Sequence, residues 1–250
     1  MKVLSTDIIR IGSARVARYA GLMAATVLVA AVGLQFAGRA AAEDARVIPA
    51  PSMDEKGASA STETVVLAGG CFWGVQGVFQ HVNGVISATS GYTGGSKDAA
   101  HYEMVSSGDT GHAESVRIVF DPHKISYGHL LQIYFSVAHD PTELNYQGPD
   151  SGTQYRSAIF PTSQSQVDVA KAYIDQLNHA KAFDAAIVTK IEPGRQFYAA
   201  EDYHQDFLTT HPSYPYIVIN DLPKVKSLQH LFPKDYRSDP VLVMASASAN

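Results

Sequence analysis

The hydrophobic and polar positions of this chain repeat with two different periods, and each period predicts one kind of secondary structure. Apolar residues at every second position predict strands, as Val116, Ile118 and Phe120 do within residues 113–120. Apolar residues three and four positions apart predict helices that bury one face. The expected strands are residues 64–68, 85–92, 113–120, 156–160 and 187–191. The expected helices are residues 72–82, 126–137, 164–182 and 200–211.

The order of these elements predicts the fold class. A strand and a helix are followed by two strands, a helix, a strand, a helix and a strand. Because strands and helices do not alternate strictly, an α+β fold is favoured over a doubly wound sheet. We expect a ferredoxin-like two-layer sandwich, with helices on a mostly antiparallel sheet and long irregular C-terminal segments. The polar residues 139–155 have no clear period, and so long a loop in a compact domain is usually functional.

The N-terminal residues have a pattern of their own. Residues 1–18 carry four basic residues and one acidic residue, residues 19–38 are uncharged and mostly apolar, and residues 40–42 are alanines. This pattern indicates a secretory signal peptide over residues 1–42 that is cleaved after Ala42. The apolar stretch is also long enough for an uncleaved membrane anchor. We therefore expect an exported, periplasmic protein, or one tethered by this segment.

The residues after this segment predict the domain boundaries. Residues 43–62 are rich in Pro, Ala, Ser and Thr, which is typical of a flexible linker. The folded domain is expected over residues 63–237, and a frayed tail over residues 238–250.

The composition excludes several classes of protein. The formal net charge is -5 and Lys and Arg are not clustered, so nucleic acid is not an expected partner. The single cysteine, Cys71, excludes an intramolecular disulfide, a C-x-x-C redox pair and a cysteine-rich zinc site. His112 and Glu114 match the H-x-E of zinc deaminases, but the P-C-x-x-C of that signature is missing. Since the histidines show no strong ligand spacing, we expect no metal.

The candidate chemistry lies at Cys71, which follows Gly69 and Gly70. Cys71 stands between the predicted strand 64–68 and the predicted helix 72–82. Unpaired N–H groups and the positive end of the helix dipole lower the pKa of a thiol in that position. The alternative is a small core residue, which is what most free cysteines are. A reactive Cys71 would also suit a cysteine hydrolase or acyltransferase, provided that the fold brings a histidine to it.

A series of short segments gives a more specific indication. Gly70-Cys71-Phe72-Trp73-Gly74 is similar to the active-site motif of type A peptide-methionine sulfoxide reductases, which act on the S-epimer of methionine sulfoxide. The resemblance continues in the family's order and covers about residues 64–236. The other matching segments are Gly91–Gly95, His101–Tyr102, Ser107–Glu114, His139–Pro141, Gly152–Ser157 and Glu201–Gln205.

The resemblance implies a catalytic domain that reduces methionine sulfoxide, in proteins and as the free amino acid, and so repairs oxidised proteins. Cys71, as the thiolate, is implied to attack the sulfoxide sulfur and to become a sulfenic acid as methionine leaves. Glu114 is implied to donate the proton, which requires that burial raises its pKa. From the residues alone, the alternative for Glu114 is an exposed position on a half-buried strand, which is the more common case.

The resemblance also implies which residues bind the substrate. Tyr102 and Tyr155 match tyrosines that hydrogen-bond the sulfoxide oxygen. Phe72 and Trp73 match the apolar pocket for the methyl group. Asp150 matches an aspartate that helps to hold substrate or water, although a solvated loop carboxylate is the alternative. Neither a cofactor nor a metal is implied, because the electrons come from thiols.

One departure from much of the family concerns how the oxidised Cys71 is reduced back to a thiol. Many members carry resolving cysteines near the C-terminus, whereas residues 211–222 contain none, as in the one-cysteine branch. The expected reductant is therefore an external thiol, either a thioredoxin-like or glutaredoxin-like protein or a small thiol. The third tyrosine of the family's site corresponds to Tyr214 or Tyr216. We expect a monomer. A second interpretation of the function is a binding module that recognises methionine sulfoxide without reducing it.

Overall fold

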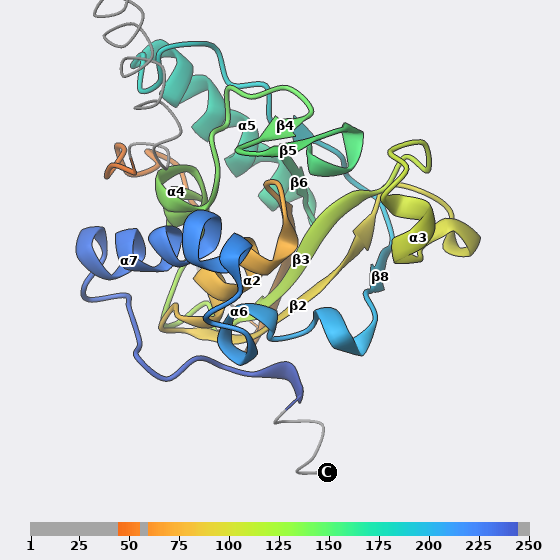
Figure 1. Ribbon diagram of the computed structural model, residues 1–250. Helices are drawn as coiled ribbons and strands as arrows, with labels where there is room; N and C mark the ends of the chain where they lie inside the picture. The colour runs from red at the N-terminus through yellow and green to blue at the C-terminus, as the bar shows by residue number, and fades with distance from the viewer. Residues whose placement is uncertain (1–44, 56–59, 245–250) are drawn as a thin grey trace, which may run out of the picture. The chain divides into compact units, whose positions relative to one another are not determined.

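The structure is a computed structural model, and it describes residues 45–55 and 60–244 of the 250-residue chain (Figure 1). The expected signal peptide or anchor, residues 1–42, lies outside the described residues, as do residues 245–250 of the expected tail. Within the described ranges, no helix is long and apolar enough to cross a membrane.

Six strands form one sheet in the order β7-β6-β1-β3-β2-β8 (Figure 1). Neighbouring strands are antiparallel except β6 and β7, which are parallel. Side chains of β1 alternate between two faces, so that Val65 and Leu67 join the main core while Val66 and Ala68 join a small cluster on the other face. The predicted α+β class with a mostly antiparallel sheet is confirmed. The strands are β1 (Glu63–Ala68), β2 (Val85–Thr93), β3 (Ala113–Phe120), β6 (Ala158–Phe160), β7 (Lys190–Ile191) and β8 (Phe197–Ala199), and the separate pair β4 (Tyr146–Gln147) and β5 (Asp150–Ser151).

Two of the helices begin at serine caps. The Oγ of Ser126 accepts the N–H of His129 at 3.2 Å, and the Oγ of Ser163 accepts the N–H of Gln166 at 3.1 Å, which satisfies N–H groups that lack a partner in the helix. Helix α2 lies against β2 and β3 and also packs against α7 (Figure 1). The α-helices are α2 (Phe72–Gln80), α3 (Tyr102–Val105), α4 (Tyr127–Ile133), α5 (Gln164–His179), α6 (Phe207–Thr210) and α7 (Leu222–Leu231).

The expected helix over residues 200–211 is wrong, because the chain breaks at Asp206. This residue has a left-handed backbone, with φ of 56°, which a continuous helix does not allow. Its carboxylate accepts the side-chain amide of Gln80 at 2.6 Å and the N–H groups of Val243 and Met244 at 3.0 and 2.9 Å. These tertiary hydrogen bonds outweigh the local helical pattern, and they hold part of the tail that was expected to be frayed.

The irregular C-terminal segments expected from the sequence include residues 212–223, but these contain a π-helical turn, η5 (Ile217–Asp221), that continues into α7. Pro223 lies in the first turn of α7, where a missing N–H costs nothing. The apolar pattern did not predict α7, because Val225 and Leu228 are its only fully buried residues.

The structure also differs from the flexible linker expected over residues 43–62. Residues 45–55 pack on the domain, with the side chain of Ile48 buried in the core. The carboxylate of Asp54 accepts the N–H of Gly128 at 2.8 Å at the start of α4. An acidic side chain is favourable at that end of a helix, and this contact ties the segment down.

Candidate active site

The turn between β1 and α2 places Cys71 at the N-terminal end of a helix. Cys71 is the N-cap residue of α2, as its sequence position indicated. Gly70 before it has φ of +85°, a conformation that favours glycine. A Cβ on Gly70 would lie 2.6 Å from the Cβ of Gln147, so close packing requires glycine as well.

The lowered thiol pKa predicted from helix position is wrong. Burial raises the pKa of Cys71 well above its usual value, and the negative charges of Glu114 and then Asp221 raise it further. A hydrogen bond from the backbone of Trp73 acts in the opposite direction without reversing the shift. Cys71 is half-buried as a residue, so solvent reaches part of it. In the substrate-free protein Cys71 is therefore a neutral thiol.

Glu114 lies on β3, with its carboxyl group at the start of α2. The side chain is 4% exposed, and its Oε2 accepts the N–H of Phe72 at 3.0 Å. Burial raises the pKa of Glu114 to about 8, although the Phe72 hydrogen bond acts against the shift. The predicted direction of this pKa shift is confirmed. Near neutral pH Glu114 is mostly a carboxylic acid that can donate a proton beside Cys71.

Tyr102 and Tyr155 reach the same site from α3 and from a short 3₁₀ turn, η3 (Thr153–Tyr155). Burial raises the pKa of both hydroxyls, and the charges of Glu114 and Cys71 raise both further. Both hydroxyls therefore stay protonated and can donate hydrogen bonds at neutral pH. The fold thus brings together four of the side chains singled out in the sequence.

Asp150 lies on β5, and its Oδ2 accepts a hydrogen bond from the Tyr216 hydroxyl. Burial raises the pKa of Asp150, and this hydrogen bond acts against the shift. The pKa of Tyr216 is raised by burial and next by the charge of Cys71, which puts its hydroxyl at the site. Tyr214 and Tyr216 both lie edge-on to the Trp73 ring, with centroids 6.2 and 6.0 Å from it. Of the two, Tyr216 is the one whose hydroxyl donates to Asp150, and it therefore joins Asp150 at the site.

The two aromatic residues after Cys71 are placed differently. Trp73 stacks on Phe207, with centroids 3.9 Å apart and planes at 10°, and its Nε1 donates to Nδ1 of His204 at 3.2 Å. These contacts fix the indole as a rigid apolar surface. Phe72 is fully buried, with its ring 5.8 Å from Tyr92 and 5.0 Å from His204. Phe72 therefore packs beneath the site in the core.

Two residues that hold the site in place, Glu201 and His204, were interpreted from the sequence only as part of a segment that sets loop and helix geometry. Glu201 accepts the N–H of Tyr102 at 3.1 Å with Oε1 and the hydroxyl of Tyr92 at 2.8 Å with Oε2. His204 accepts the indole N–H of Trp73. Both lie in the matching segment 201–205, which was the only signal for them, because hydrogen bonds over such sequence separations leave no local pattern.

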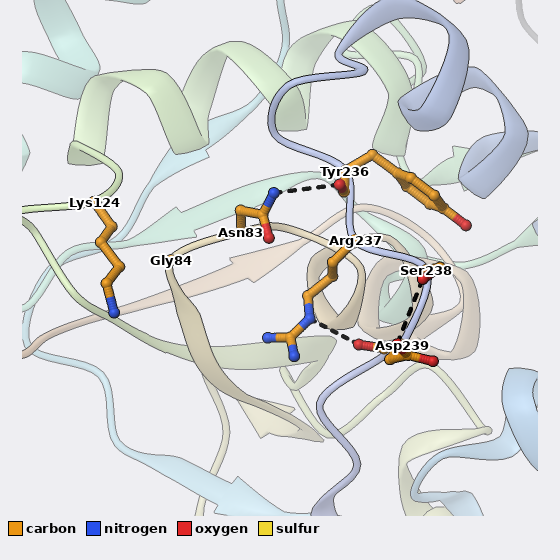
Figure 2. Close-up of a pocket in the computed structure, with 7 residues that line it drawn as sticks. All are labelled: Asn83, Gly84, Lys124, Tyr236, Arg237, Ser238 and Asp239. Carbon is orange, nitrogen blue, oxygen red and sulfur yellow. Dashed lines mark hydrogen bonds between the residues drawn. The ribbon is translucent and has the colours of Figure 1, made fainter.

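Neither a metal group nor the surface hollow of Figure 2 competes with this site. Among residues 45–55 and 60–244, no group of three or more His, Cys, Asp or Glu is placed to hold a metal ion. A hollow of about 720 Å³ lies beyond the C-terminal end of α2, next to Asn83 and Gly84. Figure 2 shows Lys124 beside it and Arg237 bonded to Asp239 through its Nε. Its lining residues include no cysteine, and their one acidic residue, Asp239, is exposed.

The fold and the site together define a chemical class of enzyme. A cysteine at a helix N-terminus lies beside a buried, neutral carboxylic acid, two protonated tyrosines and a fixed indole. Such a site suits a thiol enzyme that attacks a polar, oxygen-bearing group and protonates the oxygen.

Comparison with known proteins identifies the family. The sequence matches the peptide methionine sulfoxide reductase family over residues 63–236. It is 64% identical over 196 residues to peptide methionine sulfoxide reductase MsrA 2 of Mesorhizobium japonicum, covering 78% of this chain and 100% of that relative. It is 50% identical over 190 residues to peptide methionine sulfoxide reductase MsrA 2 of Synechocystis sp., covering 75% and 89%. The chain belongs to the peptide methionine sulfoxide reductase family.

Two solved structures share the fold. Mxr1 from Saccharomyces cerevisiae in reduced form has a TM-score of 0.57 at 32% identity, over 66% of this chain and 94% of that one. Methionine sulfoxide reductase A of Corynebacterium diphtheriae has a TM-score of 0.53 at 30% identity, over 71% and 92%. The sequence resemblance and the fold therefore point to the same family.

Proposed function

We propose that this chain reduces the S-epimer of methionine sulfoxide to methionine, in proteins and as the free amino acid, and so repairs oxidised proteins. Family membership supports the reduction, since the similar proteins are named for it. The observation that carries the chemistry is the neutral Glu114 carboxyl beside the Cys71 thiol. A thiol and an acid are the two groups that sulfoxide reduction needs.

The proposed first step transfers oxygen from the substrate to Cys71. The sulfur of Cys71 attacks the sulfoxide sulfur, Glu114 protonates the sulfoxide oxygen, and the thiol proton of Cys71 replaces the one that Glu114 gave. The attack forms a bond between the two sulfur atoms. That bond and the S–O bond of the substrate then break as the oxygen, with its proton, forms an S–O bond on Cys71. Thiol and sulfoxide thus become sulfenic acid and methionine, with atoms and electrons balanced.

The proposed binding mode follows from the polarity of the substrate. The hydroxyls of Tyr102 and Tyr155 donate to the sulfoxide oxygen, and the Trp73 indole packs against the methyl group. The pair of Asp150 and Tyr216 holds the polar side of the site, where substrate or water binds. Because the described site residues all come from one chain, a monomer is sufficient.

The proposed second step needs a thiol from outside. The sequence holds no other cysteine, so an external thiol attacks the sulfenic acid of Cys71, forms a mixed disulfide and releases water. A second thiol then releases Cys71 and leaves with the first as a disulfide. The donor is a thioredoxin-like or glutaredoxin-like protein, or a small thiol. The pattern of residues 1–42 supports export to the periplasm, with that segment cleaved or kept as a tether.

Sulfoxide reduction with dithiothreitol tests this function. We expect wild type to release methionine from the S-epimer and not from the R-epimer, Cys71→Ser to be inactive, and Glu114→Gln to lose about 10²–10⁴-fold in kcat. Asp168→Asn, an exposed carboxylate on α5, is the matched control and should keep full activity. Equal turnover of both epimers would contradict the proposed epimer preference.

The alternatives predict other outcomes. A cysteine hydrolase would cleave esters or peptides without sulfoxide turnover, whereas the charged groups that shift the pKa of Cys71 are carboxyls. A binding module would show saturable binding of methionine sulfoxide with no methionine released. Either result would contradict the reductase.

A further inference from the structure

A carboxyl group that the proposed mechanism does not use lies beneath the first turn of α2. Asp221 is the last residue of η5, and its side chain is fully buried. A Cβ on Gly74 would lie 2.2 Å from the Oδ1 of Asp221. The Asp221 carboxyl therefore fills the space that a side chain at position 74 would take, which explains why this position is glycine.

The position that a side chain of residue 74 would occupy has a known role at the N-terminal ends of helices. With Cys71 as N-cap, Gly74 is the third residue of α2, the N3 position. In a capping box, an acidic side chain at N3 reaches back toward the N-cap residue. Asp221 supplies a carboxyl at this place from a distant part of the chain. It is therefore directed at the same helix end as the Cys71 thiol.

Hydrogen bonding does not explain why the Asp221 carboxyl is buried. Among the described residues, neither carboxyl oxygen of Asp221 has a hydrogen-bond partner, although buried polar groups nearly always have one. Burial raises the pKa of Asp221 to about 7, with the positive charge of Lys224 acting against the shift and Asp150 adding to it. A structural carboxylate would be expected to be ionised and bonded, so its placement calls for another explanation.

We propose that Asp221 is a positioning residue that acts through Cys71, holding the nucleophile as a thiol until substrate occupies the site. The inference rests on the proposed function in taking Cys71 as the nucleophile. The negative charge of Asp221 opposes formation of the thiolate and acts on Glu114 in the same direction. A resting thiol resists oxidation better than a thiolate, and this chain has no second cysteine to rescue an oxidised Cys71.

Other groups also face Cys71 and must be kept constant in any test. They are Glu114 on β3, Asp150 on β5, Tyr102 on α3, Tyr155 on η3 and Tyr216 before η5, while Lys224 on α7 faces Asp221. The variant Asp221→Asn keeps the shape of the side chain and removes only its charge. Asp239→Asn, an exposed residue beside the hollow of Figure 2, is the matched control.

The test is the pH dependence of Cys71 alkylation by iodoacetamide, followed by mass spectrometry on the full chain. In Asp221→Asn we expect the profile to move to lower pH by about one unit, so that alkylation near pH 8 is roughly tenfold faster. Asp239→Asn should follow wild type. An unchanged profile in folded Asp221→Asn, with an unchanged thermal midpoint, would overturn the proposal.

Two further measurements keep the outcome decisive. In the sulfoxide assay, Asp221→Asn should move the alkaline limb of kcat to lower pH and leave KM unchanged, since Asp221 acts on Cys71 and Glu114 and not on the substrate. If Asp221→Asn does not fold, Asp221→Ser is scored by the same alkylation profile. Alkylation requires no sulfoxide turnover, so failure of this proposal and failure of the proposed function give different results.

Discussion

At the scale of single residues, the surroundings of Cys71 and Glu114 matter more than their positions in secondary structure. The helix N-terminus favours a thiolate at Cys71, yet burial and three neighbouring carboxyls raise its pKa. The same burial raises the pKa of Glu114 to about 8. Both groups therefore begin the reaction with their protons, and binding of substrate must activate the sulfur.

The first prediction is that activity falls above about pH 8. Glu114 must be protonated to donate, and a raised pKa means that it keeps its proton below about 8 and loses it above. We expect kcat/KM to fall about tenfold per pH unit on that side. Glu114→Gln, measured over the same range, should have low activity without this limb. An identical limb in Glu114→Gln would assign the titration to another group.

The raised pKa of Glu114 also predicts how the free energy of unfolding depends on pH. Folded Glu114 holds its proton up to about pH 8, while the unfolded chain releases it near the ordinary glutamate pKa of 4.5, so the folded state binds more protons between these two pH values. Its contribution to stability is therefore complete below about 4.5 and declines as pH rises toward 8. Urea unfolding at several pH values should show a flatter dependence for Glu114→Gln.

A matched pair of tyrosine variants tests the polar side of the site. Tyr216→Phe removes the hydrogen bond to Asp150 and should lower kcat/KM roughly tenfold, about 1.4 kcal/mol. Tyr214→Phe keeps the ring that meets Trp73 and should change it by less than about twofold. Steady-state kinetics with free methionine sulfoxide measures kcat/KM for both variants. Equal losses would contradict the assignment of Tyr216.

At the scale of elements, local patterns predicted what local forces determine. The apolar stripes located α4 and α5, and alternation located β3. Helix 200–211 failed because Asp206 is held by Gln80 and by the tail, contacts that no local pattern contains. Helix α7 was missed because it buries few apolar residues.

The site residues divide in the same way, into those that the sequence indicated and those that only the packed structure shows. Cys71, Glu114, Tyr102, Asp150 and Tyr155 were available from the family resemblance, and the fold brings them together. Asp221 carried no signal, because its importance depends on meeting Gly74 across the sequence. The direction of the Cys71 pKa shift also needed the packed structure, since burial does not follow from a position at the start of a helix.

The Asp206 hydrogen bonds give a prediction for the C-terminal segment. Asp206→Ala leaves the Gln80 amide and two backbone N–H groups without their acceptor, so we expect the free energy of unfolding to fall by about 2–4 kcal/mol. The exposed Asp202→Ala should change it by less than about 0.5 kcal/mol. Urea unfolding measures both. Equal stabilities would show that the tail contact contributes nothing.

At the scale of the whole molecule, one sheet and the helices on it assemble a site from distant segments. Cys71 comes from the β1–α2 turn, Glu114 from β3, Asp150 from the β4–β5 pair and Tyr216 from the segment before η5. In the proposed cycle, the chain contributes both groups that reduce the substrate, while the sequence holds no second cysteine to reduce Cys71 afterwards. Under that proposal the chain completes the first half of the cycle alone and depends on an external thiol for the second half.

The most direct test of this account is a single turnover without an external thiol. Reduced protein is mixed with excess S-epimer methionine sulfoxide, and released methionine and the mass of the chain are measured together. We predict one methionine per chain and a gain of one oxygen atom at Cys71, reversed by added thiol. Release of several methionines per chain, or none with Cys71 unmodified, would contradict it.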